Sequence, residues 1–403
     1  MLTKNGERAL CYIVKIDDII PIEGYDRVEQ AIVGGWRVIV SKADKFQPGD
    51  LAIYYEIDSL VDSQDERYDF LEKRKYRIKT QKMCGTISQG LIMPLSLFPE
   101  IIEPIEGTDL TETLGVKYYV PEDNKRKSNK VNPKAKFQAM AARHPKLFKK
   151  KPIRWLARRE WGRKLLFVFL GRKKDTPKGF PTKFPYVKKS DEERCENIPF
   201  ILKDKSPWVK TVKIDGTSSL FLLERKKRNK FEYWVCSRNV RQLDRSQACY
   251  HDDNVYWEVE DKYNIRKCLE DILTKHPEWG YVAIQGESAG CTASGAKIQG
   301  DPHKFGELKF FAYNFITPDI GRWGSIEGKE YLKQYDIPWV PIVDENYILP
   351  DDFEEFKLSA DGECEVKGAS GLREGYVYRR KVFIDSGINS FKNVSREYLL
   401  KHN

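Results

Sequence analysis

The stretch Trp208-Val-Lys-Thr-Val-Lys-Ile-Asp-Gly-Thr-Ser218 decides the fold of the C-terminal half of this 403-residue chain. Residues 208–212 are rich in β-forming types, Asp215-Gly216 is a turn signal, and residues 219–224 favour a second strand. We expect this strand–turn–strand arrangement to place Lys213 at the floor of a cleft. A lysine amine attacks only when it is neutral, so a nucleophilic Lys213 needs a cationic neighbour or a metal ion that lowers its pKa. By itself, K-x-D-G is also typical of a surface turn.

Further motifs follow Lys213 in order along the chain. They are Ser237-Arg238-Asn239 after the predicted strand 231–236, Gln285-Gly286-Glu287 at the end of the apolar run 281–284, the aromatic strand 310–316 with Tyr313, Glu374-Gly375-Tyr376-Val377-Tyr378-Arg379, and Ser390-Phe391-Lys392. Together they resemble the motifs of the lysine-dependent covalent nucleotidyltransferases, which are ATP-dependent RNA ligases, DNA ligases and mRNA capping enzymes. The resemblance spans residues 213–392. It implies an α+β nucleotidyltransferase domain, adenylyltransferase and ATP-grasp-like, with antiparallel sheets.

Two features favour the Deinococcus/Naegleria type of RNA ligase, the fifth RNA ligase family. The lysine lies far into the chain, after a predicted OB-like domain, and only about ten residues follow Lys392. Residues 77–94, Arg-Ile-Lys-Thr-Gln-Lys-Met-Cys-Gly-Thr-Ile-Ser-Gln-Gly-Leu-Ile-Met-Pro, are similar to the N-terminal module of that family. DNA ligases and capping enzymes usually carry their OB domain after the catalytic domain.

The resemblance implies a role for each matched residue. Lys213 would attack the α-phosphate of ATP and form lysyl-AMP, an in-line phosphoryl transfer that needs positioning and charge stabilisation. Asp215, Glu287 and Glu374 would hold a hydrated Mg²⁺ or Mn²⁺, since magnesium keeps much of its water. The remaining contacts would be Lys392 on the α-phosphate, Arg238 on the ribose or a 5′-phosphate, Tyr313 stacked on adenine, and Arg379 as a further candidate on phosphate. Each role has a structural alternative. The three carboxylates could instead form ion pairs with nearby lysines or arginines, and Tyr313 could instead pack in the core.

The chain departs from the family pattern at two positions. Val212 stands directly before the lysine, where many relatives have a glutamate, so no such side chain is present to recognise adenine. Ser390 stands where some ligases have a second lysine. The segment 121–190 is also longer than the usual connector of this family.

Residues 7–120 are predicted to be β-rich. Short runs rich in Val, Ile and Tyr cover 9–16, 36–40 and 51–57, and turn signals separate them. Strands at this spacing favour a small barrel of the OB type. Residues 67–82 carry seven basic residues, which form either the basic loop of a single-strand binder or a solvated basic hairpin. We therefore predict an all-β, OB-like nucleic-acid-binding domain over residues 1–120 and the nucleotidyltransferase domain over residues 191–403.

The positive charge is concentrated between these domains. The chain has 70 basic and 60 acidic residues, a net charge of +10. Residues 1–120 and 191–403 have net charges of −5 and −4, whereas residues 121–190 have +19. We expect a basic, partly helical linker or insertion, with short helices between 135 and 170 and a loop over 171–185. Phosphate-backbone binding, attachment to an anionic membrane and a solvated linker are the three interpretations.

The composition excludes several classes of protein. An apolar content of 40% argues against global disorder. The longest clean apolar run, about residues 165–170, is too short to span a bilayer, and residues 1–9 lack the apolar core of a signal peptide. The eight cysteines and five histidines show no zinc-site spacing. Unpaired cysteines fit a reducing compartment, so we expect a cytoplasmic protein.

The motifs and the charge distribution together predict an ATP-dependent RNA ligase. It would form lysyl-AMP on Lys213, transfer AMP to a 5′-phosphate end as AppN, and let a 3′-hydroxyl attack that end and release AMP, as in RNA repair. The expected partners are ATP, Mg²⁺ or Mn²⁺, and a nicked or broken RNA or an RNA/DNA hybrid, bound by a monomer away from membranes. A DNA ligase, a capping-type guanylyltransferase and a catalytically inactive nucleic-acid-binding relative are the alternatives.

Overall fold

The computed structural model describes residues 8–119, 191–227, 230–238 and 254–402, with Arg241 and a few isolated residues between 152 and 187. Residues 1–119 and 182–403 form one unit, and residues 120–181 form a second unit. The predicted basic segment over 121–190, with its short helices and its loop, therefore lies almost entirely outside the described residues. Within the described part of the chain, no helix is long and apolar enough to cross a membrane.

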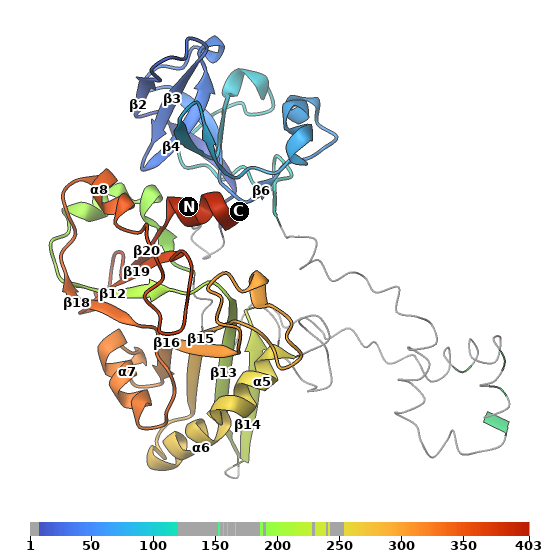
Figure 1. Ribbon diagram of the computed structural model, residues 1–403, viewed down its shortest axis with the longest axis vertical. Helices are drawn as coiled ribbons and strands as arrows, with labels where there is room; N and C mark the ends of the chain where they lie inside the picture. The colour runs from blue at the N-terminus through green and yellow to red at the C-terminus, as the bar shows by residue number, and fades with distance from the viewer. Residues whose placement is uncertain are drawn as a thin grey trace. The chain divides into compact units, whose positions relative to one another are not determined.

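The N-terminal domain is built from short antiparallel strands (Figure 1). β1 (Cys11–Lys15) pairs with β5 (Leu51–Tyr55), which pairs with β9 (Leu91–Pro94). β2 (Asp18–Pro21), β3 (Val28–Val33) and β4 (Trp36–Ser41) form a second sheet. β7 (Thr80–Met83) and β8 (Thr86–Gln89) form a hairpin, and β6 (Ser59–Leu60) pairs with β10 (Lys117–Tyr118). Three 3₁₀ helices lie between them: η1 (Lys42–Asp44), η2 (Glu66–Arg74) and η3 (Leu95–Leu97). The strands predicted over 9–16, 36–40 and 51–57 are confirmed as β1, β4 and β5.

Burial explains the sequence pattern of these strands. Tyr12 and Val14 of β1 belong to one hydrophobic cluster of the domain, whereas Cys11 and Ile13 belong to another. A strand covered on both faces has a continuous apolar run, which is why β1 shows no alternation. β4 alternates buried and partly exposed residues, as a strand covered on one face does.

The predicted basic stretch from Arg67 to Lys82 contains a 3₁₀ helix. Residues Glu66–Arg74 form η2, and its N-cap Asp65 accepts a hydrogen bond from the main-chain N–H of Arg67 at 3.0 Å. Tyr68 and Leu71 of η2 are buried, and this burial holds the segment in a helix despite its charge. Six of the seven basic residues therefore lie in the one connection between β6 and β7, and the seventh, Lys82, lies on β7.

The C-terminal domain contains two five-stranded sheets (Figure 1). In the first, the order is β11 (Glu193–Arg194), β20 (Ser390–Val394), β19 (Gly375–Arg380), β12 (Trp208–Lys213) and β18 (Ile342–Tyr347). In the second, the order is β14 (Lys230–Ser237), β13 (Thr217–Lys226), β15 (Tyr281–Ala289), β16 (Lys309–Thr317) and β17 (Gly321–Arg322). Every pair is antiparallel except β11–β20. The strands predicted around the motifs are confirmed, but β15 continues through Gln285-Gly286-Glu287, which the sequence placed at a strand end.

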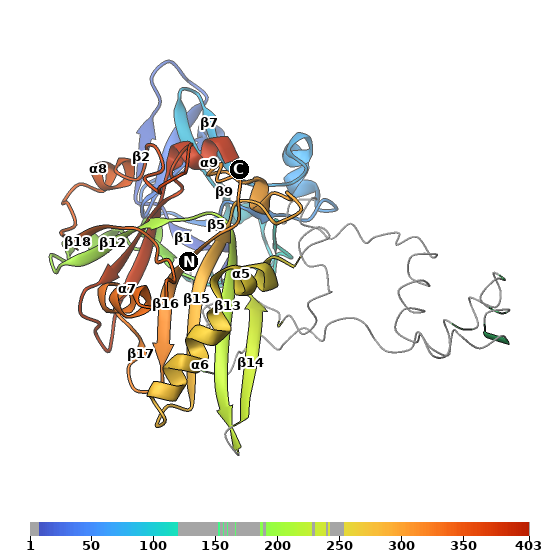
Figure 2. The same ribbon diagram turned by 60° about the horizontal axis from the view of Figure 1, so that its bottom comes forward.

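Short helices complete this domain. α5 (Val255–Tyr263) and α6 (Ile265–Lys275) lie along the second sheet (Figure 2), and Cys268, Leu269, Ile272 and Leu273 of α6 are buried there. The remaining helices in the described residues are η4 (Cys195–Asn197), η5 (Pro199–Lys203), η7 (Ile298–Gly300), α7 (Ser325–Lys333), α8 (Phe353–Leu358) and α9 (Arg396–His402).

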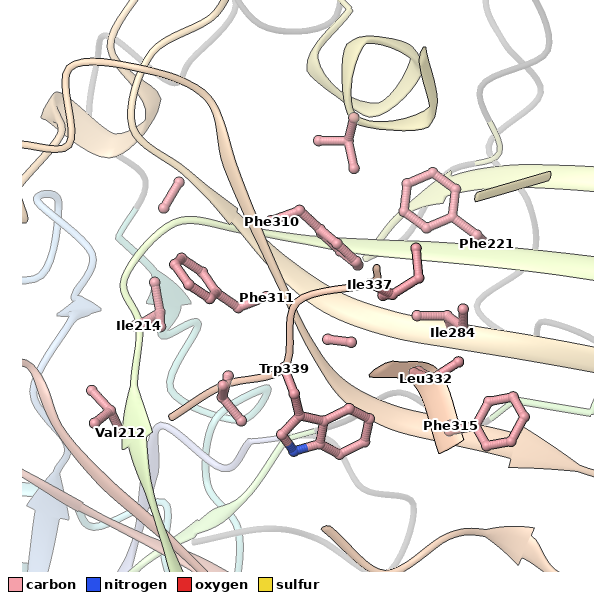
Figure 3. Packing of buried hydrophobic residues seen from close by; sticks show 14 of the residues in the cluster. Val212, Ile214, Phe221, Ile284, Phe310, Phe311, Phe315, Leu332, Ile337 and Trp339 are labelled. Atoms are coloured by element: carbon pink, nitrogen blue, oxygen red, sulfur yellow. The ribbon is translucent and has the colours of Figure 1, made fainter. Parts of the chain in front are cut away.

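One hydrophobic core joins both sheets of the C-terminal domain. Figure 3 shows part of it, with Val212 and Ile214 on one side of the view and Phe310, Phe311 and Trp339 next to them. Val212 is 1% and Ile214 4% exposed. The two neighbours of Lys213 in sequence are thus buried anchors, and they fix the backbone on both sides of the lysine.

Candidate active site

Lys213 is the last residue of β12 and contacts the glutamate that directly precedes the neighbouring strand, β19. In the ladder between β12 and β19, Lys213 stands opposite Gly375, which directly follows Glu374. Lys213 Nζ donates a hydrogen bond to Glu374 Oε1 at 2.5 Å, and the two side chains form an ion pair. Strand register therefore brings together two motifs that lie 161 residues apart in the sequence.

Asp215 is held at both its main chain and its side chain. The main-chain N–H of Asp215 donates to His303 Nε2 at 2.9 Å. Asp215 Oδ2 accepts a hydrogen bond from the hydroxyl of Tyr398 at 2.6 Å. His303 is fully buried and Tyr398 is 3% exposed, so neither partner is accessible to bulk water. The acidic residue of the K-x-D-G turn is therefore fixed in place.

A glycine brings the turn after β12 against the second sheet. A Cβ atom on Gly216 would lie 2.2 Å from the main-chain oxygen of Ser288 on β15, so only glycine fits at this approach. Next along the chain, Ser218 on β13 stands opposite Glu287 on β15. The close approach and the register together place Glu287 beside the lysine and the other two carboxylates, whose charges act on it.

The charges of this cluster are unbalanced, with one lysine among three carboxylates. Burial raises the pKa of Asp215 to about 7, and the negative charge of Glu374 adds to this effect. Burial also raises the pKa of Glu287 to about 8, with Lys213 opposing and Glu374 and Asp215 adding. Burial lowers the pKa of Lys213, but Glu374, Asp215 and Glu287 outweigh it, so this pKa lies above its usual value. The lowered pKa expected from the sequence for a nucleophilic lysine is therefore not found in the ligand-free site.

A second cluster joins Lys392 and Arg238 through Asp191. Asp191 Oδ1 accepts from Lys392 Nζ at 2.9 Å, and Asp191 Oδ2 accepts from Arg238 Nη2 at 2.7 Å. The two cations outweigh the effect of burial and hold the pKa of Asp191 well below its usual range. Burial lowers the pKa of Lys392, and the positive charge of Lys213 contributes to that lowering. The two clusters are thus parts of one site.

Tyr313 and Arg379 lie on a further side of this site. The hydroxyls of Tyr313 and Ser218 are 3.0 Å apart and share a hydrogen bond. Arg379 is 4% exposed; its guanidinium donates to the main-chain oxygen of Tyr313 and to Glu192 Oε1, the latter at 3.4 Å. Glu192 also accepts a hydrogen bond from the hydroxyl of Ser390. Arg379 therefore supports the strand of Tyr313 from within the protein.

The N-terminal and C-terminal domains each match a different protein-family model. Residues 206–394 match the family described as RNA ligase, and residues 10–95 match an OB-fold domain. The ligase match covers the domain that contains Lys213 and the motifs that follow it, and the predicted resemblance to RNA ligases is confirmed. The predicted fold, an N-terminal OB domain followed by a domain with antiparallel sheets and few helices, is confirmed.

Solved RNA ligases have the same architecture along their whole length. Naegleria gruberi RNA ligase with pyrophosphate superposes with a TM-score of 0.71 at 26% identity, covering 98% of this chain and 99% of that one. A variant of the same ligase with ATP and Mn has a TM-score of 0.71 at 27% identity and the same coverage. Another variant, with AMP and Mn, has a TM-score of 0.70 at 26% identity, again covering 98% and 99%. No curated protein sequence matches the chain.

The carboxylates of the ligase domain fit a hydrated cation better than a directly coordinated one. Among the described residues, no three histidine, cysteine or acidic side chains are placed to hold a metal ion directly. Glu374 Oε2 is nevertheless buried and has no hydrogen-bond partner. Burial raises the pKa values of Asp215 and Glu287, and repulsion from neighbouring carboxylates adds to this effect. A divalent cation reached through its water ligands would satisfy this oxygen and offset the repulsion.

The structure brings all the site residues predicted from the sequence into these clusters and adds others. Asp191, Glu192, His303 and Tyr398 were not predicted, although each contacts a predicted residue or its strand. His303 is a single histidine without a motif, and Asp191 and Glu192 directly follow the basic segment. For Tyr398, the available signal was its proximity in sequence to Lys392, which it follows by six residues.

Proposed function

We propose that the chain is an ATP-dependent RNA ligase that joins 3′-hydroxyl and 5′-phosphate ends through lysyl-AMP and AppN intermediates. The observation that carries this proposal is the position of Lys213, at the end of β12 and in contact with Glu374, with Asp215, Glu287 and Lys392 near enough for their charges to interact with it. One amine among carboxylates, with a second partly buried lysine nearby, fits nucleotidyl transfer, which needs a nucleophile and stabilisation of phosphate charge.

Lys213 is the proposed nucleophile, and its amine attacks the α-phosphate of ATP while pyrophosphate leaves. The raised pKa of Lys213 means that the ligand-free amine carries a proton, which must leave before attack. Asp215, Glu287 and Glu374 would hold a divalent cation, which would supply the positive charge that lowers the pKa of the amine and neutralises phosphate. Glu374 is the group placed to accept the proton of Lys213, because its Oε1 is 2.5 Å from Nζ.

Lys392 and Arg238 are the proposed phosphate contacts. Both are cations that share one carboxylate, Asp191, so their side chains converge on a single point. Lys392 binds the α-phosphate during both transfers of AMP, and Arg238 binds the ribose or the 5′-phosphate end. Tyr313 stacks on adenine and is oriented by Ser218 and by the buried Arg379. We propose Arg379 as a positioning residue here, because its guanidinium points to Tyr313 and Glu192 rather than into the phosphate site.

RNA is the proposed polynucleotide substrate, either nicked in a duplex or broken, and paired with RNA or with DNA. The OB domain and the basic segment 121–190, with its net charge of +19, are the proposed contacts for its phosphates. The ATP and Mn named for the Naegleria gruberi structures support ATP and a divalent cation as the cofactors of this chain. The seven cysteines in the described residues are free thiols, which supports a reducing, cytoplasm-like compartment.

The direct test is covalent labelling with ATP that carries a radioactive α-phosphate. Lys213→Arg keeps a cation beside Glu374 but cannot be deprotonated, so we expect it to abolish the label. Lys210→Arg makes the same exchange on the same strand, three residues away, and should leave labelling intact. Labelling of Lys213→Arg at the rate of the natural protein would refute the nucleophile. Labelling by GTP in preference to ATP would indicate a capping-type enzyme instead.

The polynucleotide is tested separately with nicked duplexes in which RNA and DNA are exchanged on each side of the nick. We expect sealing when the 3′-hydroxyl strand is RNA, and the panel shows whether the 5′-phosphate strand is RNA, DNA or either. Sealing of an all-DNA nick as fast as an all-RNA nick would assign the chain to the DNA ligases.

A further inference from the structure

Tyr398 contacts the reaction centre from the last helix that the structure describes. Its hydroxyl donates to Asp215 Oδ2 at 2.6 Å, although the two residues are 183 positions apart in the sequence. Tyr398 is 3% exposed, so water does not compete for this hydrogen bond. An isolated carboxylate rotates about its side-chain bonds, whereas one bound at an oxygen by a buried hydroxyl has a fixed plane.

The start of α9 is attached to a second acidic residue of the site. The main-chain N–H of Ser395, the residue before α9, donates to the main-chain oxygen of Glu374 at 2.9 Å. Ser395 Oγ accepts from the N–H of Tyr398 at 3.0 Å and donates to Asp361 Oδ1 at 2.7 Å. Hydrogen bonds therefore connect the start of α9 to Glu374 and the hydroxyl of Tyr398 to Asp215.

The other side of α9 is seated on the OB domain. Leu399 of α9 and Val394 of β20 belong to a hydrophobic cluster whose other members come from the OB domain, such as Trp36 and Tyr54. Figure 2 shows α9 next to β7, which it contacts. Arg396 of α9 binds both carboxylate oxygens of Glu354, at 2.7 and 3.1 Å, and Arg37 of β4 donates to the same carboxylate at 2.9 Å. The helix thus connects the OB domain physically to Asp215.

We propose that Tyr398 is a positioning residue for the divalent-cation site, and that it acts by orienting the carboxylate of Asp215. This inference rests on the proposed function, in which Asp215, Glu287 and Glu374 hold a hydrated cation. Groups that hydrogen-bond the side chains around a metal are themselves required for metal affinity, and losing one typically weakens binding by about 10- to 100-fold. A purely structural role for Tyr398, fastening α9 to the domain, is the competing explanation.

The test measures Mn²⁺ binding to the full chain without ATP, from the electron paramagnetic resonance signal of free Mn²⁺. Tyr398→Phe keeps the ring and its packing and removes only the hydroxyl. Tyr233→Phe is the matched control, because the hydroxyl of Tyr233 also donates to a buried carboxylate, Glu260, away from the site. We expect Tyr398→Phe to raise the dissociation constant for Mn²⁺ by about tenfold or more. The control should not change it.

The same proteins are then compared in single-turnover formation of lysyl-AMP over a range of Mn²⁺ concentrations. We expect Tyr398→Phe to need about tenfold more Mn²⁺ for half-maximal rate and to approach the natural rate at saturating Mn²⁺, because the variant retains every group of the site. A loss of thermal stability with unchanged Mn²⁺ affinity would overturn the proposal in favour of the structural role. Failure of the natural chain itself to bind Mn²⁺ and to form lysyl-AMP would instead refute the proposed function.

Discussion

Lys213 Nζ lies 2.5 Å from Glu374 Oε1, and this lysine forms an ion pair with one member of the three-carboxylate cluster while its charge acts on the other two. The side chains are 24% and 13% exposed, so the pair is largely shielded from water. A shielded lysine that neutralises several acids contributes to stability as well as to reactivity, because its removal leaves buried charges without a partner.

Because the cluster has one lysine and three carboxylates, we predict that removing Lys213 destabilises the protein more than removing Glu374. At pH 8, Lys213→Met should lower the free energy of unfolding by about 2–3 kcal/mol, because the carboxylates then repel one another without compensation. Glu374→Gln should cost less than about 1 kcal/mol, since Lys213 keeps Asp215 and Glu287 as partners and one repulsion is lost. Urea unfolding of the full chain measures both values. Equal losses for the two variants would contradict this distribution of charge.

A second prediction concerns stability and pH in the ligand-free protein. Unfolded Asp and Glu have pKa values near 4, whereas those of Asp215 and Glu287 in the fold are about 7 and about 8. Between pH 5 and pH 8 the folded protein therefore binds more protons at these groups than the unfolded chain does. Their contribution to stability is present at low pH and is lost as pH rises through those values.

Glu287→Gln removes one of these two groups. Its melting temperature should exceed that of the natural protein by a few degrees at pH 8, and the difference should disappear at pH 5. Glu330→Gln, at an exposed position on α7, serves as the control and should follow the natural protein at both values. A melting temperature that is lower for Glu287→Gln at pH 8 would show that this carboxylate is ionised and paired in the ligand-free site.

Asp191 provides a third prediction, which separates stability from reaction. Asp191→Asn removes the shared partner of Lys392 and Arg238, and should slow formation of lysyl-AMP roughly tenfold or more because Lys392 is no longer held in place. Asp204→Asn is a matched control: Asp204 pairs with Arg380 and its side chain is 21% exposed, compared with 20% for Asp191. Both variants should melt at a lower temperature than the natural protein, and only the first should be slow. Equal rates for the two would show that Asp191 has a structural role alone.

The strands around the motifs were predictable because local patterns determine them. β12, β14, β16 and β19 are dense in β-branched and aromatic residues, whereas the pairing of β12 with β19 that places Lys213 beside Glu374 comes from the structure. The contacts of Tyr398 with Asp215 and of Lys392 with Asp191 join residues 183 and 201 positions apart. They depend on the packing of α9 against the OB domain and on β11 beside β20, which no local pattern encodes.

A fourth prediction is that the K-x-D-G turn requires glycine at position 216 for steric reasons. Gly216→Ala places a Cβ atom 2.2 Å from the main-chain oxygen of Ser288, so the turn before β13 and β15 must separate at a cost of about 1–3 kcal/mol. The same substitution at Gly280, where no atom lies within 4 Å of the added carbon, should leave stability unchanged or slightly higher. Thermal unfolding compares the two variants. A Gly216→Ala protein as stable as Gly280→Ala would mean that the turn has room for a side chain.

The last prediction concerns the +19 net charge of residues 121–190, which we propose binds RNA phosphates. Affinity for a 5′-phosphorylated RNA should fall steeply between roughly 50 and 300 mM salt, because each phosphate contact releases counterions. Exchanging the cluster Lys146, Lys149, Lys150 and Lys151 for glutamine should weaken binding at low salt and flatten this dependence. Exchanging four exposed lysines of the C-terminal domain, Lys227, Lys267, Lys333 and Lys367, changes the net charge by the same amount and serves as the control. If both sets weaken binding equally, the total charge attracts RNA; if only the first does, the contact lies in the basic segment.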